Sequence, residues 1–235
     1  MIDTISKSPD EMCRCGKPRL KTFVKWANRW IHSKWCEECE KKAIEHSELA
    51  EEEERKNVIR RAIIREIEPI YYKSSLKDFN EQIVEILNKK PEGKSVFIWG
   101  STGTGKSHLA SAMVKQALVA GLKAKMIRFK DMLLAVRASY DSKHTEEAVY
   151  RKFINCDLLS IEDVGTVKSG NRESDFSQDT LLTVIDARLQ RYKPTIITTN
   201  LSPEAVWDSF GDRLGSRFST FLTFKLEGRD RRLPE

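Results

Sequence analysis

The segment from Gly100 to Ser107 constrains this chain more than any other part of its sequence. It reads Gly-Ser-Thr-Gly-Thr-Gly-Lys-Ser, follows the apolar stretch 95–99 and overlaps the start of the periodic stretch 107–120. The pattern G-x-x-x-x-G-K-[ST] between a buried strand and a helix is typical of a loop that cradles phosphate groups. Such a loop favours a fold of parallel strands joined by crossover helices.

The residue types of this loop match the chemistry of a nucleoside triphosphate. Its glycines let successive backbone N–H groups turn inward and approach phosphate oxygens closely. The Lys106 ammonium supplies charge to the β and γ phosphates, and the Ser107 hydroxyl completes part of a Mg²⁺ shell. The loop residues expected to contact the nucleotide are Gly100, Ser101, Thr102, Gly103, Thr104, Gly105, Lys106 and Ser107.

A second apolar stretch, predicted as a strand over 157–161, ends in the acids Glu162 and Asp163. A phosphate loop needs carboxylates at a neighbouring strand end, where they hold the metal and activate water. We expect Glu162 to join Ser107 around Mg²⁺ and Asp163 to accept a proton from the attacking water. Isolated acid pairs at strand ends are more often plain surface residues, and the upstream loop is what favours the functional interpretation.

Asn200 follows the strand predicted over 195–199. Its amide is suited to binding and orienting the lytic water, from a strand between those that carry the loop and the acids. Asparagine also ends many strands for its turn chemistry alone. Spacing leaves both interpretations open.

From residue 94 onward, apolar runs alternate with periodic segments. The predicted strands are 95–99, 124–129, 157–161, 195–199 and 221–226, and the predicted helices are 107–120, 130–140, 146–155, 178–192 and 203–210. Five strands with crossover helices make a doubly wound α/β domain.

A set of motifs in this order resembles the AAA+ ATPase core of the DnaC/DnaI helicase loaders, which is related to the DnaA initiator and the IstB transposition ATPases. The motifs lie at 103–110, 158–165, 185–194, 198–201 and 211–218. The resemblance implies a five-stranded parallel P-loop sheet that binds ATP at the junction of two subunits, with His108 beside the nucleotide. It also implies that Asn200 senses the γ-phosphate and that subunits assemble into an ATP-dependent ring or spiral.

The resemblance places an arginine finger in the helix after Asn200. Arg217 matches the finger position best, and Arg213 is expected as a supporting cation, because side chains at this spacing share a helix face. A planar guanidinium fits the phosphate charge of a neighbouring subunit's ATP. An ordinary pair of surface arginines is the plainer alternative.

Two departures from the family pattern bear on turnover and architecture. The acids run Glu162-Asp163, whereas the usual order starts with aspartate, so metal geometry or hydrolysis rate is expected to differ. The sequence stops at Glu235, shortly after the last predicted strand. We therefore expect no C-terminal helical lid, as in the loader and transposition-helper branch.

Cysteines crowd into two short pairs near the start of the chain, separated by about 20 residues, which is close to the spacing of four-cysteine zinc sites. The expected ligands are Cys13, Cys15, Cys36 and Cys39. Closed four-thiolate sites are structural, so this module is expected to fold around Zn²⁺ without catalysing a reaction. A redox-active pair is the main rival, His32 is a weaker candidate ligand, and Cys156 is expected in the core.

The surface of this module is expected to be aromatic and basic. The residues concerned are Phe23, Trp26, Trp30 and Trp35, interleaved with Lys21, Lys25, Arg29 and Lys34. Such a face suits single-stranded nucleic acid or a protein partner. Resemblance to zinc-bearing loaders favours docking on the hexameric replicative DNA helicase.

We expect three parts: a zinc module at 1–42, a helical linker at 43–73 and an AAA+ ATPase domain at 74–235. Isoleucines at helical spacing beside acidic and basic runs predict a linker helix that ends at Pro69. A solvated connecting helix is the simpler interpretation, and a helix that docks a partner through its isoleucines is the alternative.

Composition limits the partners and the compartment expected for this chain. Basic residues number 41 against 35 acidic ones, a formal charge of +6, so an anionic partner is worth testing. No apolar run approaches the ~18–20 residues of a membrane helix, so we expect no membrane contact. Residues 1–11 also lack the apolar stretch of a signal peptide, so we expect a cytoplasmic protein. In that reducing compartment, the crowded cysteines point to metal rather than to disulfides.

We therefore expect an ATPase that loads the replicative helicase onto single-stranded DNA, with slow turnover stimulated by DNA or helicase. The expected DNA contacts are Lys130, Arg137, Lys143, Arg151 and Lys152, although scattered solvated charges are an equal alternative. A transposition helper that binds duplex DNA is the alternative function, and a nucleotide-gated adaptor without meaningful turnover is a third.

Overall fold

The computed structural model describes residues 5–24, 29–89, 93–140, 145–165 and 174–228 of the chain. The chain divides into two compact units, Met1–Val58 and Ile59–Glu235. Helix α1 (Glu37–Glu66) continues across the boundary between the units and across residue 42. The predicted division into three separate parts, with boundaries after residues 42 and 73, therefore stays a prediction.

The first unit contains a three-stranded antiparallel sheet in the order β1-β2-β3. Its strands are β1 (Ile5–Met12), β2 (Pro18–Val24) and β3 (Arg29–His32). The turn between β1 and β2 is tight: the Gly16 N–H donates to the Cys13 carbonyl at 2.9 Å and the Cys13 N–H to the Lys17 carbonyl at 2.8 Å. Gly16 has φ +82°, a left-handed conformation that glycine adopts without strain.

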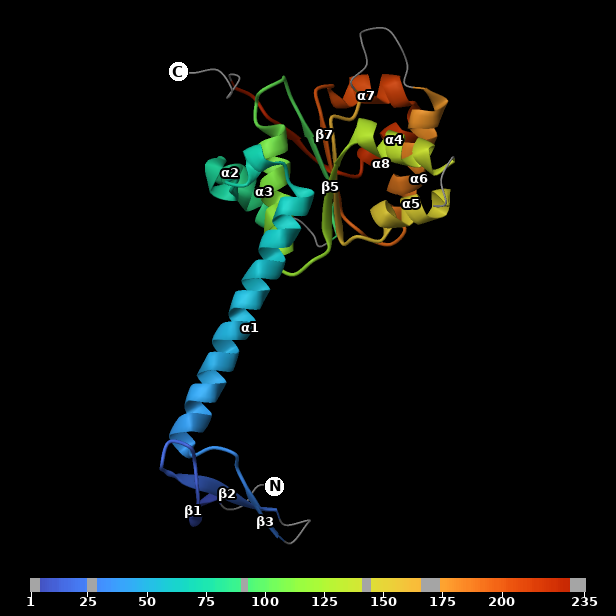
Figure 1. Cartoon of the computed structure of the whole chain (residues 1–235). Coiled ribbons are helices and arrows are strands. Elements are labelled where there is room, and N and C mark those ends of the chain that lie inside the picture. The colour runs from blue at the N-terminus through green and yellow to red at the C-terminus, as the bar shows by residue number, and fades with distance from the viewer. Residues whose placement is uncertain (1–4, 25–28, 90–92, 141–144, 166–173, 229–235) are drawn as a thin grey trace. The chain divides into compact units, whose positions relative to one another are not determined.

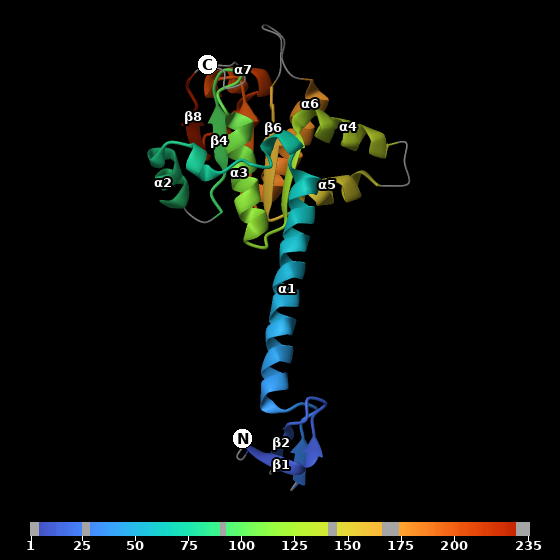
Figure 2. The ribbon, with the colours of Figure 1, turned by 60° about the vertical axis from the view of Figure 1, so that its left-hand side comes forward.

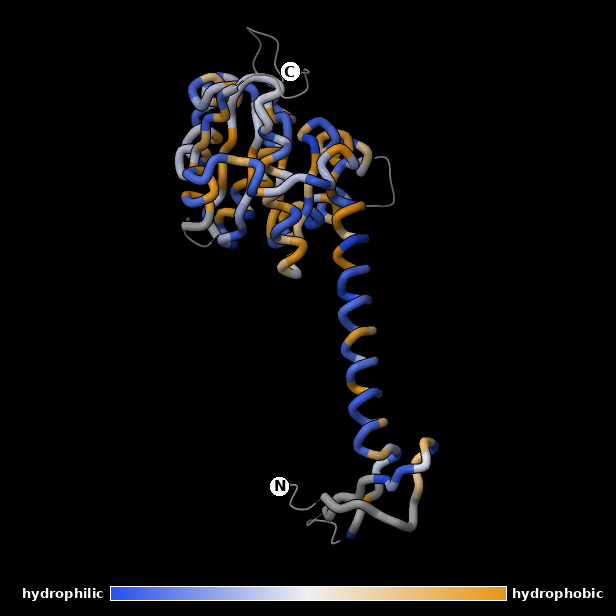
Figure 3. The backbone as a smooth tube through the Cα atoms, turned by 90° about the vertical axis from the view of Figure 1, so that its left-hand side faces the viewer, coloured by the Kyte–Doolittle hydropathy of each residue, from blue (hydrophilic) through white to orange (hydrophobic). Residues whose placement is uncertain are grey.

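Helix α1 runs for 30 residues, and none of them is buried. Figure 3 shows that most of its length is hydrophilic. Pairs one turn apart, such as Lys41–Glu37 and Lys56–Glu52, support it locally. A helix is present here as predicted, although it begins at Glu37, ahead of the predicted linker at 43–73, and its role as a linker stays a prediction. It ends at Glu66, ahead of Pro69, because a residue before proline avoids the helical conformation and Glu68 is extended.

The second unit is built on a parallel sheet with strand order β5-β6-β7-β4-β8. The strands are β4 (Val96–Trp99), β5 (Ala124–Arg128), β6 (Leu158–Glu162), β7 (Thr195–Thr199) and β8 (Leu222–Lys225). The predicted doubly wound five-stranded domain is confirmed. Strand β7 lies between β6 and β4, as expected for the strand that ends at Asn200.

Helices cover both faces of this sheet (Figures 1 and 2). On one face lie α2 (Glu81–Lys89) and α3 (Lys106–Val119). On the other lie α4 (Phe129–Ser139), α5 (Glu146–Ile154), α6 (Asp175–Leu189), α7 (Pro203–Phe210) and α8 (Asp212–Phe218). Among α3 to α7, which were all predicted, the largest shift from the predicted boundaries is at α6, because Ser174 caps it by accepting from the Ser177 N–H. Helices α2 and α8 were not among the predicted helices.

Neighbouring residues of strand β4 pack into two different hydrophobic cores, one on each face of the sheet. Phe97 packs with α4 to α8, whereas its neighbours Val96 and Ile98 pack with α2 and α3. All three are at most 1 % exposed. Strands buried on both faces read as continuous apolar runs, which is why the sequence predicted them well. Cys156 is buried in the first of these cores, as expected.

Arg188 of α6 is fully buried and ties together the amino-terminal edge of the sheet. Its guanidinium donates to the carbonyl oxygens of Phe153 at 2.7 Å, Cys156 at 2.9 Å and Pro194 at 2.6 Å. Backbone carbonyls thus satisfy a charge that would otherwise be costly to bury. No helix in the described part of the chain is long and apolar enough to cross a membrane.

Candidate functional site

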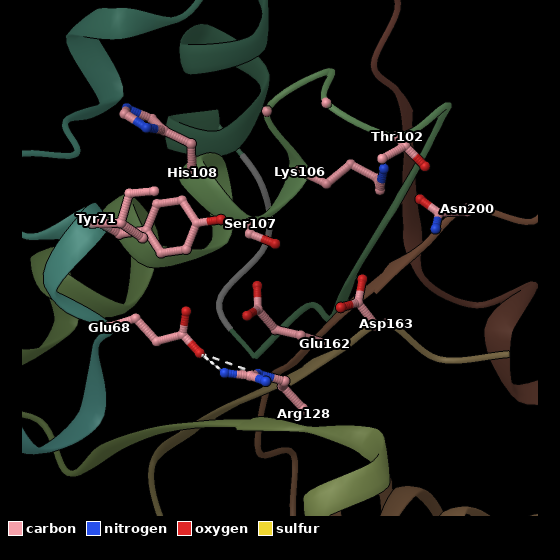
Figure 4. Close-up of a pocket in the computed structure, with 13 residues that line it drawn as sticks. Glu68, Tyr71, Thr102, Lys106, Ser107, His108, Arg128, Glu162, Asp163 and Asn200 are labelled. Carbon is pink, nitrogen blue, oxygen red and sulfur yellow. Dashed lines mark hydrogen bonds and ion pairs between the residues drawn. The ribbon is translucent and has the colours of Figure 1, made fainter. Parts of the chain in front are cut away.

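A cavity of about 560 Å³ opens at the carboxyl edge of the parallel sheet (Figure 4). The ends of β4, β6 and β7 meet there, which is where ligands bind in open α/β sheets. Its lining residues are Glu68, Ile70, Tyr71, Thr102, Gly103, Gly105, Lys106, Ser107, His108, Arg128, Glu162, Asp163 and Asn200. The structure therefore brings together the predicted loop, the two acids and Asn200.

The loop depends on glycine at defined positions. Gly103 and Gly105 have φ values of +82° and +97°, and Gly105 directly precedes α3. At Gly100, a Cβ atom would lie 2.2 Å from the carbonyl oxygen of Leu226. These positions turn the backbone into the amino terminus of α3, where free N–H groups and the helix dipole favour an anion.

Lys106 is buried at the start of α3. Its Nζ atom donates to the carbonyl oxygens of Gly100 at 3.0 Å and Ser101 at 2.8 Å. The Thr104 hydroxyl donates to the same Ser101 carbonyl at 2.9 Å and closes the loop. These bonds hold the ammonium against the loop whose N–H groups are expected to surround a phosphate.

Glu162, the last residue of β6, is 6 % exposed. Its Oε1 atom has no hydrogen-bond partner among the described residues. Burial raises the pKa of this carboxyl to about 7, against the opposing effect of a hydrogen bond from Ser107. An unpartnered buried carboxylate oxygen next to a hydroxyl is a donor set that fits Mg²⁺.

Asp163 follows with φ +53°, a left-handed conformation that is uncommon outside glycine. Its N–H donates to the Thr198 hydroxyl at 3.2 Å, and the Val164 N–H donates to the Thr198 carbonyl at 2.9 Å. These bonds fasten the end of β6 to β7. In Figure 4, the exposed Asp163 carboxylate lies on the same side of the cavity as Lys106 and Asn200.

Four lining residues were not predicted from the sequence: Glu68, Ile70, Tyr71 and Arg128. Arg128 ends β5 in register with Glu162, and its guanidinium pairs with Glu68, with Nε 3.1 Å from Oε1. The ion pair raises the pKa of Arg128 above its ordinary value. Arg128 stands near the carboxyl end of a predicted strand, and this position could have identified it as a residue of the cavity. The other three reach the cavity through tertiary packing.

His108 fastens the segment before α2 to helix α3. Its Nε2 atom lies 2.7 Å from Asp78 Oδ2, and its ring meets those of Tyr71 and Phe79 at centroid distances of 6.3 and 5.5 Å. The segment is further held by Lys115, which donates to the Tyr72 carbonyl at 2.8 Å. The wall of the cavity beyond the phosphate loop is therefore fixed to α3.

The two candidate finger arginines lie elsewhere. Both belong to α8, and neither is among the described residues that line the cavity of their own chain. Arg213 is exposed, whereas Arg217 is paired with Asp186 of α6. The prediction that one of them acts on a neighbouring subunit stays a prediction.

The four cysteines predicted as zinc ligands, Cys13, Cys15, Cys36 and Cys39, come together in the first unit as free thiols. All four Sγ atoms lie within 4.8 Å of one another, and those of Cys15 and Cys36 are 3.4 Å apart. Hydrogen bonds from the backbone N–H groups of Cys15 and Cys36 lower the pKa of the Cys13 thiol to about 6. Neighbouring thiols raise the pKa of Cys39 to about 12, so a cation is needed for all four to ionise together. This donor set fits a structural Zn²⁺. The side chain of His32 lies outside the described residues.

Comparison with known proteins identifies the family. Residues 63–216, well over half of the chain, match the family model of IstB-like ATP binding proteins. The chain belongs to this family. As an IstB-like ATP-binding protein it has an AAA+ domain of the IstB/DnaC type, and this domain binds and hydrolyses ATP.

The relatives of this IstB-like protein include proteins named as replicative helicase loaders. It is 27 % identical over 211 residues to the uncharacterised protein YdaV of Escherichia coli K12, covering 85 % of this chain and 80 % of YdaV. It is 29 % identical over 119 residues to the replicative helicase loader DnaC of the same strain, covering 50 % of this chain but only 47 % of DnaC. A crystal structure of the DnaC helicase loader has the same fold, with a TM-score of 0.59 at 21 % identity, and the match covers 68 % of this chain and 100 % of that one.

Replacing Glu162 by glutamine is expected to stabilise the nucleotide-free protein, and more so at high pH. The unfolded carboxyl ionises near the ordinary glutamate pKa, whereas the folded one keeps its proton until about pH 7. The wild-type chain therefore loses stability as pH rises through this window, and the uncharged amide does not. The gain in free energy of unfolding should be about 2 kcal/mol larger at pH 8 than at pH 5.5.

Urea unfolding without nucleotide, followed by tryptophan fluorescence at both pH values, measures this difference. Asp163→Asn is the matched control, because Asp163 is an exposed acid in the next position. A gain for Glu162→Gln that is the same at both pH values would show that the Glu162 carboxyl is not held neutral by burial.

Proposed function

We propose that this chain is an ATP-dependent loader that places the hexameric replicative DNA helicase on single-stranded DNA when replication begins. The observation that carries the proposal is an IstB/DnaC-type nucleotide site in one compact unit and a four-cysteine cluster in the other. Similarity to the loader DnaC covers about half of either chain and supports it. The protein acts in the cytoplasm, and its turnover is slow until DNA or helicase stimulates it.

The residues of the cavity divide the chemistry of hydrolysis among them. The loop N–H groups and Lys106 bind the phosphates, and Ser107 with Glu162 holds Mg²⁺, which neutralises charge on the β and γ phosphates. Asp163 accepts the proton of the attacking water, and Asn200 orients that water and senses the γ-phosphate. The exposed position of Asp163 beside Asn200 supports this division, because water reaches both side chains.

A complete site requires a second subunit. Arg217 of one subunit acts as the finger on the ATP of its neighbour, and Arg213 supports it at the same interface. Both arginines lie on α8, away from their own cavity, which supports an action between subunits. ATP-dependent assembly into a ring or spiral follows from this arrangement.

The cysteine cluster holds one Zn²⁺ and builds the module that docks on the helicase. Arg29 and Lys34 are exposed there, and the Lys34 ammonium lies 5.3 Å from the centre of the Trp35 ring. The remaining aromatic and basic side chains predicted for this face, Lys21, Phe23, Lys25, Trp26 and Trp30, lie outside the described ones.

Changing both Cys36 and Cys39 to serine is expected to remove one zinc per chain and to abolish helicase binding. Two of four thiolates are lost, and structural zinc supplies much of the folding free energy of such a module. Elemental analysis and a helicase pull-down of the full chain measure both effects. Cys156→Ser, a change at a buried cysteine outside the cluster, is the control for zinc content. Zinc-free wild-type protein purified under reducing conditions would contradict the assignment.

Candidate contacts for single-stranded DNA lie on α4 and α5. Lys130, Arg137, Arg151 and Lys152 are exposed, and Lys143 lies outside the described residues. Arg137 lies over the Phe176 ring at 4.7 Å, and Arg151 pairs with Glu147 at 2.7 Å. These local contacts leave each cation at the surface, where it is available to phosphate.

Binding to DNA distinguishes the proposed function from its alternative. We expect ATP-dependent binding to single-stranded DNA that weakens steeply between 50 and 200 mM salt, because neutralised phosphates release counterions. Fluorescence anisotropy with single-stranded and duplex oligonucleotides of one sequence measures the preference. Tighter binding to duplex would instead favour a transposition helper, the alternative suggested by the IstB-like family.

A further inference from the structure

The ion pair between Asp186 of α6 and Arg217 of α8 has a defined geometry. Arg217 Nε lies 2.8 Å from Asp186 Oδ1, and Nη2 lies 3.4 Å from Oδ2. The side chains are 35 % and 30 % exposed, so the pair is neither buried nor fully solvated. The carboxylate raises the pKa of Arg217 above its ordinary value, which keeps the guanidinium charged.

This geometry uses only one edge of the guanidinium. Arginine has five N–H donors in a rigid fork, and Asp186 faces the edge formed by Nε and Nη2. The end of the fork, formed by Nη1 and the second N–H of Nη2, points away from that carboxylate. An anion on another molecule can therefore engage the end of Arg217 while Asp186 stays in place.

The helix that carries Arg217 is anchored by other contacts. Leu214 and Phe218 of α8 are buried in the same core as Leu181 and Ile185 of α6. Packing against α7 is equally close, since a Cβ atom on Gly215 would lie 2.3 Å from the ring of Trp207. The position of α8 is thus set by apolar packing, which leaves the ion pair to orient the Arg217 side chain.

We propose that Asp186 is a positioning residue that holds Arg217 in the orientation required to reach the nucleotide of a neighbouring subunit. This inference rests on the proposed role of Arg217 between subunits and adds a residue from a different helix to that role. A long arginine side chain loses rotamer freedom when it engages a phosphate, and a carboxylate that fixes it beforehand lowers that loss. Asp186 is not among the described residues that line the cavity, and in this proposal it acts only through Arg217.

The test uses Asp186→Asn in the full chain, because asparagine keeps the size and removes the charge. We expect ATP binding at wild-type affinity, an unchanged melting temperature and turnover of the assembled protein lowered roughly 10- to 100-fold. Mixing Asp186→Asn with Lys106→Ala subunits should restore part of this turnover, because the latter supply a positioned Arg217 to an intact cavity. Asp186→Glu should retain more activity than Asp186→Asn.

Two further variants separate positioning from a structural role. In the double variant Asp186→Asn/Arg217→Ala, turnover should equal that of Arg217→Ala, since Asp186 acts through Arg217. Glu147→Gln, which removes a more exposed ion pair with Arg151 on α5, should leave turnover without DNA unchanged.

Wild-type turnover of Asp186→Asn would overturn the inference, and so would a loss that Lys106→Ala subunits fail to restore. If Arg217→Ala itself turns over ATP normally, the proposed role of Arg217 fails together with this inference. If Arg217→Ala is inactive and Asp186→Asn is fully active, only the positioning role of Asp186 fails.

Discussion

Lys106→Ala is expected to lose nearly all ATP turnover and most ATP binding. The Lys106 ammonium is buried at the start of α3 and held by the Gly100 and Ser101 carbonyls of the loop, so we expect it to meet the phosphates without competition from bulk water. Removing a preorganised donor from a desolvated site lowers turnover by roughly 10²- to 10³-fold, and the lost full charge adds to this. Steady-state phosphate release and binding of a fluorescent ATP analogue measure the two effects.

A matched control comes from the opposite edge of the sheet. Lys123 is exposed immediately before β5, so Lys123→Ala removes the same charge from the chain without touching the cavity. Turnover should stay at the wild-type rate in that variant. Wild-type turnover in Lys106→Ala would remove the assignment of the loop as the phosphate site.

Arg217→Ala is expected to bind ATP almost normally but to hydrolyse it poorly, by roughly 10³-fold or more if Arg217 completes the site of another subunit. The reason is geometric, because Arg217 lies on α8 and is not among the described residues that line its own cavity. Equilibrium binding and single-turnover hydrolysis separate the two properties. Lys106→Ala, by contrast, damages the cavity of its own subunit and should lose ATP binding as well as turnover.

Mixing the two inactive variants tests the direction of action. An interface that joins the intact Arg217 of a Lys106→Ala subunit to the intact loop of an Arg217→Ala subunit should hydrolyse ATP. Partial turnover should therefore return across a range of mixing ratios. Assembly confirmed by light scattering without any return of turnover would show that Arg217 does not act between subunits. The same experiment with Arg213→Ala would then test the exposed arginine one turn earlier.

The sequence alone was sufficient for the five strands of the sheet, for five of its helices and for most of the cavity, whereas helices α2 and α8 were not among the predicted elements. Its strands are buried on both faces, so each appears as a continuous apolar run that needs no tertiary context to be recognised. Loop, acids and Asn200 all stand at carboxyl ends of such strands, and parallel strands bring these ends to one edge. The four cysteines were equally visible, because two cysteine pairs at short spacings are a typical zinc-ligand pattern.

Only the tertiary structure decided which residues distant in the sequence join the cavity and which pair with each other. Glu68 and Tyr71 come from the segment after α1 and reach the cavity because Arg128, His108 and Lys115 hold that segment against β5 and α3. Asp186 and Arg217 are 31 positions apart and meet because α6 and α8 pack in one core. Such pairings depend on which helix faces meet, and local periodicity carries no information about that choice. The raised pKa of Glu162 likewise follows from burial, which belongs to the folded chain and to no single segment of it.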